Sequence, residues 1–135
     1  MSQGTDAAML LLVSPIEEDY LSLGRFLVST GFRVQRAHNR QEALAALRSH
    51  RVAVVISERE LPEAGWKDVL EDLRPLVDPP FLIVTSRHAD DYLWAEVLNL
   101  GGHDVLPKPF HTSEVTRVVS LAYKRWASRQ ESTPG

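Results

Sequence analysis

Several kinds of residue and segment are missing from this chain of 135 residues, and each absence narrows what the protein can be. There is no cysteine, which excludes disulfide bonds and thiol chemistry. No run approaches the ~20 consecutive apolar residues that a membrane span requires. Residues 1–8 lack the basic and apolar segments of a secretory signal. We therefore expect a cytoplasmic protein that makes no contact with a membrane.

The chain also lacks a large excess of charge of one sign. The 15 basic and 18 acidic side chains leave a net charge of −3, which gives no general attraction to nucleic acid. The last helical stretch carries only scattered basic residues, so we expect no nucleic-acid partner. The histidines do not show the spacing of metal ligands, and we expect no metal site among them: they are His38, His50, His88, His103 and His111.

The length suits a single domain with one hydrophobic core. We expect the folded domain to cover residues 8–128. Residues 1–7 are expected to form a flexible N-terminus. Residues 129–135 are polar and end in Ser-Thr-Pro-Gly, which is consistent with a tail or with the start of a linker.

Short apolar runs alternate with amphipathic stretches along the chain. This pattern predicts strands at 8–13, 32–37, 52–57, 81–85 and 104–106, and helices at 16–30, 40–49, 66–74, 89–100 and 112–128. Alternating strands and helices imply a parallel sheet covered on both faces. We predict an α/β fold, a flavodoxin-like (βα)5 doubly wound sheet with strand order 2-1-3-4-5. Its functional crevice should lie at the carboxyl ends of strands one and three.

Two local interpretations concern helices. Glu17, Glu18 and Asp19 open the first helix, where acidic side chains favour the positive end of the helix dipole. In the helix at 89–100, Ala95 and Leu98 fit the inward face.

Three blocks of sequence carry the functional signal. The apolar run that starts at Val52 ends at Ser57-Glu58, and Pro62 follows four residues after Glu58. A second apolar run ends at Thr85-Ser86, and the strand at 104–106 is followed by Pro107-Lys108-Pro109. In this order and with these gaps, the blocks resemble the response-regulator receiver family over about residues 8–128.

The resemblance implies a role for each matching residue. Glu58 stands where the family has the aspartate that accepts phosphate. Thr85 and Ser86 correspond to the switch hydroxyl, and Lys108 to the lysine that contacts the phosphoryl group. The Lys108-Pro109 bond resembles a family peptide that is cis.

Other positions depart from the family pattern. Ser14 and Pro15 occupy the places of the two acids that bind magnesium, because the register puts Glu17 and Glu18 in the first helix. Glu58 would then be nearly the only anionic ligand, so we expect weak magnesium binding or none, and no other cofactor. The second switch position, an aromatic residue in the family, corresponds to Val105.

These substitutions predict a pseudo-receiver domain of bacterial two-component or phosphorelay signalling. Such a domain is not an enzyme, has no catalytic residues and works without phosphorylation. Glu58 would be a fixed charge beside Lys108 and Thr85, carrying one charge where a phosphoryl group adds roughly −1.5 to −2.

Two alternatives stay open. One is a functional receiver domain that a histidine kinase phosphorylates. The other is a flavodoxin-like cofactor-binding protein, although the loop from Ser14 to Glu18 has one hydroxyl, no glycine and two acids.

The resemblance also implies a protein partner. This could be a histidine kinase, a fused or separate effector domain, or a second copy of the chain in a homodimer. In the family such partners use the face formed by helix four, strand five and helix five. Tyr92, Trp94 and Trp126 could belong to this interface or to peripheral core packing.

Overall fold

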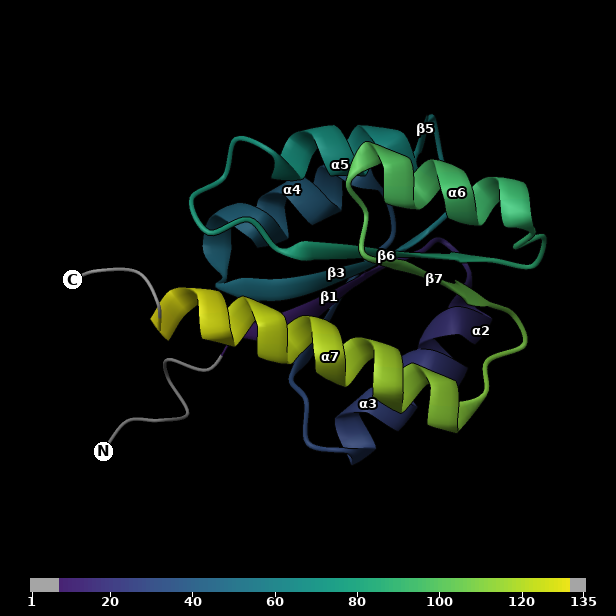
Figure 1. Ribbon diagram of the computed structural model, residues 1–135, viewed down its shortest axis with the longest axis horizontal. Coiled ribbons are helices and arrows are strands. Elements are labelled where there is room, and N and C mark those ends of the chain that lie inside the picture. Colours follow the sequence, from purple (N-terminus) through teal and green to yellow (C-terminus); the bar gives the residue numbers. More distant parts are fainter. Residues whose placement is uncertain (1–7, 132–135) are drawn as a thin grey trace.

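The fold is a five-stranded parallel sheet with helices on both faces, seen in a computed structural model that describes residues 8–131 (Figure 1). The strand order is β2-β1-β3-β6-β7, which confirms the predicted flavodoxin-like order. The strands are β1 (Met9–Val13), β2 (Val34–Ala37), β3 (Val52–Glu58), β6 (Phe81–Ser86) and β7 (Asp104–Pro107). The expectations for residues 1–7 and 132–135 lie outside the described residues.

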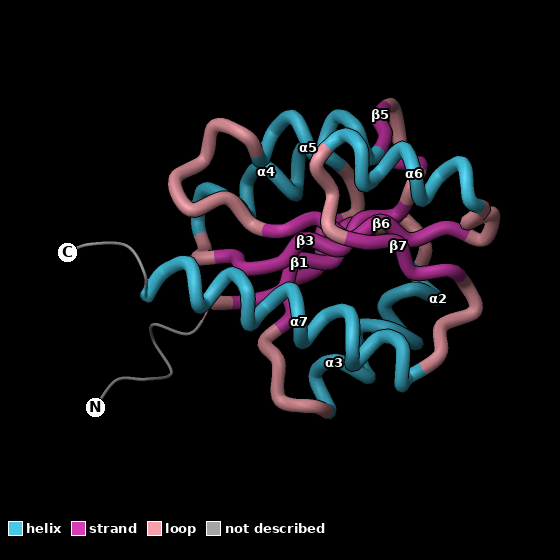
Figure 2. Tube along the Cα trace, viewed as in Figure 1, coloured by secondary structure: helices cyan, strands magenta, loops and turns pink. Residues whose placement is uncertain are grey.

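The helices form two layers, one on each side of the sheet (Figure 2). One layer contains α4 (Arg40–Ser49), α5 (Trp66–Leu73) and α6 (Asp91–Leu100). The other contains α7 (Thr112–Glu131) and a first helix of three parts: α2 (Glu17–Asp19), the π-helix η1 (Tyr20–Gly24) and α3 (Arg25–Ser29). Because α7 continues to Glu131, residues 129–131 are helical and not part of a tail. Within residues 8–131, every helix falls short of the length or apolarity that a bilayer crossing requires.

Each face of the sheet has its own hydrophobic core, and β1 contributes to both because its side chains alternate between faces. Leu11 and Val13 pack with the layer of α4, α5 and α6. Leu10 and Leu12 pack with Leu23 and with α7. All five residues of β1 are buried, as expected for a central parallel strand.

Local signals in the sequence define several ends of elements. The side chain of Asn39 accepts a hydrogen bond of 2.8 Å from the backbone N–H of Glu42 at the start of α4. Gly101 ends α6 with φ of 109°, a conformation that side-chain-bearing residues rarely adopt. A short hairpin of β4 (Glu60–Leu61) and β5 (Ala64–Gly65) follows β3, and the sequence analysis did not predict it.

The predicted inward face of α6 is wrong. Leu93 and Val97 are fully buried against the sheet, whereas Leu98 is 52% exposed and Ala95 also faces solvent. Apolar residues occur on several sides of this helix, so periodicity alone did not determine its rotation. The pair spaced four residues apart, Leu93 and Val97, is the one that fits the core.

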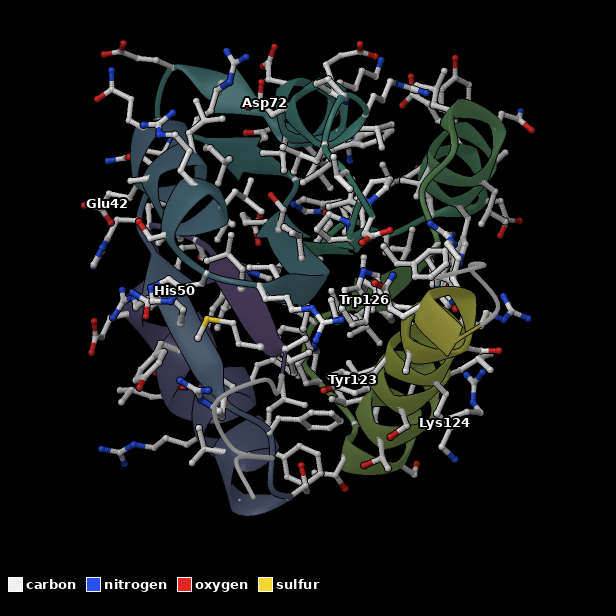
Figure 3. The ribbon with its side chains drawn as sticks, turned by 90° about the vertical axis from the view of Figure 1, so that its left-hand side faces the viewer. Glu42, His50, Asp72, Tyr123, Lys124 and Trp126 are labelled. Carbon is white, nitrogen blue, oxygen red and sulfur yellow. The ribbon has the colours of Figure 1, made fainter. Side chains whose placement is uncertain are left out.

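Trp126 belongs to the core, so the expectation that it forms part of an interface is not supported. Its side chain is 3% exposed, and its indole N–H donates a hydrogen bond of 3.2 Å to the carbonyl of Asp78. The guanidinium of Arg51 lies 4.8 Å from the ring centroid. Figure 3 shows Trp126 on the side of α7 toward the sheet, and Lys124 on its outer side.

Candidate functional site

Polar side chains from four segments meet at the carboxyl edge of the sheet. Glu58 ends β3 and is the register partner of Thr85 in β6. Ser14 directly follows β1, and Lys108 directly follows β7. Because parallel strands present their carboxyl ends at one edge, these residues converge, as the predicted topology required.

The centre of the site is the ammonium group of Lys108. Its Nζ lies 2.5 Å from Oε1 of Glu58 and 2.9 Å from each carboxylate oxygen of Asp19. The Lys108 side chain is 4% exposed, that of Asp19 5% and that of Glu58 13%. An ammonium group has three N–H donors, and here three carboxylate oxygens surround it. A cation shared by the buried carboxylate of Asp19 and the partly buried carboxylate of Glu58 is thus the main electrostatic feature of the crevice.

Glu58 also accepts a hydrogen bond from the hydroxyl of Thr85. Thr85 Oγ1 donates to Glu58 Oε1 over 3.1 Å, and the Thr85 side chain is 1% exposed. The same oxygen of Glu58 therefore receives both the ammonium and the hydroxyl. This arrangement holds the carboxylate in one orientation.

Asp19 is the functional residue that the sequence analysis missed. Its interpretation as a helix-dipole acid is incomplete, because the residue is 3% exposed and its carboxylate lies in the crevice. Glu58 was expected to be nearly the only anionic ligand in the crevice, but the Asp19 carboxylate lies there as well. Helical spacing could have identified Asp19, since it lies four and eight residues before the buried Leu23 and Leu27.

Ser14 orients the Asp19 carboxylate. Its hydroxyl donates a hydrogen bond of 2.7 Å to Asp19 Oδ2 and accepts one of 3.0 Å from the backbone N–H of Ile16. Ser14 is 2% exposed, and its hydrogen bond to Asp19 is buried. Ser14 thus supports the carboxylate that the first helix contributes to the crevice.

The turn that carries Asp19 is braced from the edge strand β2. Arg36 Nη1 lies 2.6 Å from Glu17 Oε1, and the guanidinium lies 5.3 Å from the centroid of the Tyr20 ring. The hydrogen bond and positive charge of Arg36 lower the pKa of Glu17 below its usual value. Gly24 leaves space for the Tyr20 ring, because a Cβ at that position would lie 2.8 Å from Cδ1 of the ring.

The remaining predicted positions have local roles. Ser86 is buried, and its hydroxyl accepts a hydrogen bond of 3.0 Å from the N–H of His88. The Lys108-Pro109 peptide is cis, as the resemblance implied. Pro15 is exposed, and Val105 is fully buried in the core with Leu93 and Val97.

The side chains in the crevice do not fit a magnesium ion. Such an ion needs near-octahedral oxygen ligands, usually including one or two carboxylates. The carboxylates of Asp19 and Glu58 are both bound to Lys108, whose positive charge would repel a second cation between them. Among residues 8–131 there is no group of three or more histidine, cysteine or acidic side chains arranged to hold a metal.

Two of the residues predicted for an interface, Trp94 and Tyr92, lie on α6, and Trp94 is partly buried. Its indole N–H donates a hydrogen bond of 3.0 Å to Asp104 Oδ1, which joins α6 to β7. Tyr92 is 78% exposed on α6. Of the three predicted residues, Tyr92 thus lies on the surface, Trp94 joins α6 to β7, and Trp126 belongs to the core.

Comparisons with known proteins agree with this architecture. The crystal structure of the signal receiver domain of an HD domain-containing protein from Pseudomonas fluorescens Pf-5 superimposes with a TM-score of 0.84 at 24% identity, covering 93% of each chain. The chemotaxis response regulator CheY4 of Vibrio cholerae superimposes with a TM-score of 0.76 at 20% identity, covering 85% of this chain and 98% of that one. At these identities the likeness concerns the fold.

The amino-acid sequence provides the family. The chain is 31% identical over 127 residues to the transcriptional regulatory protein CpxR of Klebsiella pneumoniae subsp. pneumoniae (strain HS11286), covering 92% of this chain and 53% of that protein. It therefore spans about half the length of this curated relative. Residues 17–120 match the response regulator receiver domain. The chain belongs to the family of response regulator receiver domains.

Proposed function

We propose that this receiver domain acts in two-component signalling as a phosphorylation-independent module that binds a protein partner. The observation that carries the proposal is the pairing of Glu58, at the phosphoacceptor position, with Lys108 and Thr85. The groups that the resemblance assigns to an incoming phosphoryl group are thus already bound to a side chain of the protein.

Phosphoryl transfer to this site faces two obstacles. The nucleophile would be Glu58, whose carboxylate lies one methylene further from the backbone than that of an aspartate, and misplacement by about 1 Å can reduce a rate by about 100-fold. The Asp19 and Glu58 oxygens that could bind magnesium surround the Lys108 ammonium instead. We therefore propose that magnesium binds weakly or not at all and that the domain uses no other cofactor.

The contacts of Thr85 support a domain held in one state. The resemblance implies that phosphorylation draws this hydroxyl inward, and here it already donates to Glu58. Val105 replaces the aromatic switch residue and is fully buried. Because Thr85 is already bound to Glu58 and the aromatic residue is absent, we propose that the domain stays in one conformation.

A partner would bind at the face formed by α6, β7 and α7. β7 is an edge strand of the sheet, between these two helices (Figure 1). The exposed large apolar residues of α6 are Tyr92, Leu98 and Leu100. The partner classes are a histidine kinase, an effector domain or a second copy of the chain. Sedimentation velocity of a Leu98→Ser variant would test the second-copy case, with loss of self-association expected if that case is right.

Intact-mass measurement after incubation with acetyl phosphate and magnesium tests the proposal. We expect no phosphoryl adduct, while a receiver domain with an aspartate at this position, treated in parallel, becomes phosphorylated. A stoichiometric adduct that is stable in acid and labile in base would contradict the proposal and favour the alternative, a functional receiver domain that a histidine kinase phosphorylates. Loss of that adduct in a Glu58→Gln variant would assign it to Glu58.

A further inference from the structure

We propose that Asp19 is a built-in ligand of Lys108 that keeps oxyanions such as phosphate out of the crevice. This inference deepens the proposed function and rests on it. It identifies the residue that makes the site unresponsive, in addition to the change at the phosphoacceptor position. Asp19 is a positioning residue, because it acts through the ammonium group of Lys108.

The first argument concerns the hydrogen-bond donors of Lys108. Asp19 provides two of the three oxygens around the ammonium, both at 2.9 Å, and Glu58 provides the third. A phosphoryl or phosphate oxygen could bind the ammonium only by displacing one of them. Removal of the Glu58 charge alone would leave both Asp19 contacts in place, so the site should still exclude an oxyanion.

The second argument is that Asp19 is held in place before any ligand arrives. Ser14 donates to its carboxylate, and Arg36 contacts Glu17 and Tyr20 of the same helical turn. The carboxylate is thus attached to a braced helix and loses little freedom when it binds Lys108. A free anion loses its translational freedom on binding and must compete against this internal ligand.

The third argument is access. Asp19 and Lys108 both line a groove between η1 and the start of α7, and Arg87 lies along the same groove. The groove therefore leads from solvent toward the residues around Lys108, with the acid Glu18 and the cation Arg87 along it. The Lys108 side chain is 4% exposed, and an entering anion would have to displace the Asp19 or Glu58 oxygens that surround its ammonium.

The experiment compares two double variants that have the same net charge. Glu58→Gln/Asp19→Asn removes both carboxylates from Lys108. Glu58→Gln/Glu18→Gln removes Glu58 and an exposed acid of the same helical turn, leaving Asp19 in place. Each protein is titrated with inorganic phosphate while the amide signals of Thr85 and Lys108 are followed by heteronuclear NMR.

We expect saturable shifts in the Asp19→Asn double variant, with phosphate binding at least tenfold tighter than in its charge-matched control. Equal phosphate binding in the two double variants, or none in either, would overturn the proposal. Such a result concerns Asp19 only, whereas a phosphoryl adduct on the unaltered chain overturns the proposed function.

A second measurement applies if the Asp19→Asn double variant does not fold. In the single variants, NMR reports the exchange of the Lys108 ammonium protons with water. We expect exchange at least about tenfold faster in Asp19→Asn than in Glu18→Gln, because the exposed Glu18 holds no buried donor. Equal exchange rates in these two variants would overturn the proposal as well.

Discussion

Lys108 Nζ lies 2.9 Å from both carboxylate oxygens of Asp19, although 89 positions separate the two residues in the chain. The contact joins the first helix to the loop after the last strand, across the carboxyl edge of the sheet. It is buried on both sides, so each charge depends on the other for compensation. The stability of the domain and the chemistry of its crevice should therefore respond to the same side chains.

Asp19→Asn should lower the free energy of unfolding by about 2–4 kcal/mol, because it leaves a buried ammonium with one carboxylate in place of two. Urea denaturation followed by circular dichroism measures this loss. Glu18→Gln is the matched control and should change stability by no more than about 0.5 kcal/mol, since Glu18 is exposed. Equal stability of the two variants would mean that the Asp19 contact contributes nothing.

Glu58→Gln should cost less, about 1–2 kcal/mol, because Lys108 retains both oxygens of Asp19 and Thr85 retains an acceptor in the glutamine. The same denaturation experiment compares the two variants directly. If Glu58→Gln proved the more damaging change, Glu58 and not Asp19 would be the principal partner of the ammonium.

Arg36→Met should raise the pKa of Glu17 toward its usual value of about 4.5, because the Arg36 hydrogen bond and charge are what lower it. A carboxyl group whose pKa is lowered by folding stabilises the protein above its unfolded-state pKa. That contribution is lost as the pH falls through the folded-state pKa. NMR titration of the Glu17 carboxyl group in both proteins measures the change.

The pKa of Glu42 provides an internal control for that titration. Its lowering comes first from the backbone N–H and side chain of His38, and only last from Arg36. We expect the Glu42 pKa to change little in the Arg36 variant. A Glu17 pKa that stayed low after the substitution would show that Arg36 does not brace this turn.

His103 should titrate below its usual pKa of about 6.5, chiefly because burial disfavours the charged ring and secondly because Arg125 lies beside it. Its Nε2 lies 3.3 Å from Arg125 Nη1, and its Nδ1 is buried without a hydrogen-bond partner among the described residues. The unfolded chain therefore binds this proton more readily than the folded one. The contribution of the neutral His103 ring to the free energy of unfolding should be fully present above about pH 6.5. It should be lost as the pH falls through the folded-state pKa of His103.

Proton NMR titration of the histidine rings tests this directly. Arg125→Gln should raise the pKa of His103 part of the way toward its usual value, because burial by the Phe81 ring remains. A His103 pKa at or above about 6.5 in the unaltered protein would contradict the prediction.

Much of the fold could be predicted because the deciding information is local. The apolar run from Val52 to Ile56 can only be a buried element, and the hydroxyl and acidic residues that follow it mark the strand end. Asn39 and Gly101 mark helix ends through their own backbone and side-chain preferences. Parallel topology then brings Glu58, Thr85 and Lys108 to one edge.

The errors share a physical cause. The rotation of α6 and the burial of Trp126 depend on which surface each helix meets, and that surface is built from distant parts of the chain. Asp19 shows the same dependence. Asp19 is the last of three consecutive acidic residues, Glu17, Glu18 and Asp19. Helical spacing can predict that its side chain faces inward, but it cannot identify the cation that the carboxylate contacts.

The amino-acid sequence by itself determined the strand order and the position of the crevice, and it places Glu58, Thr85 and Lys108 there. Each of these follows from residue types at strand ends. Only the tertiary structure decided that Lys108 is shared between Glu58 and Asp19. A buried ion pair forms where two elements pack, and its partners are chosen by that packing and not by their neighbours in the chain.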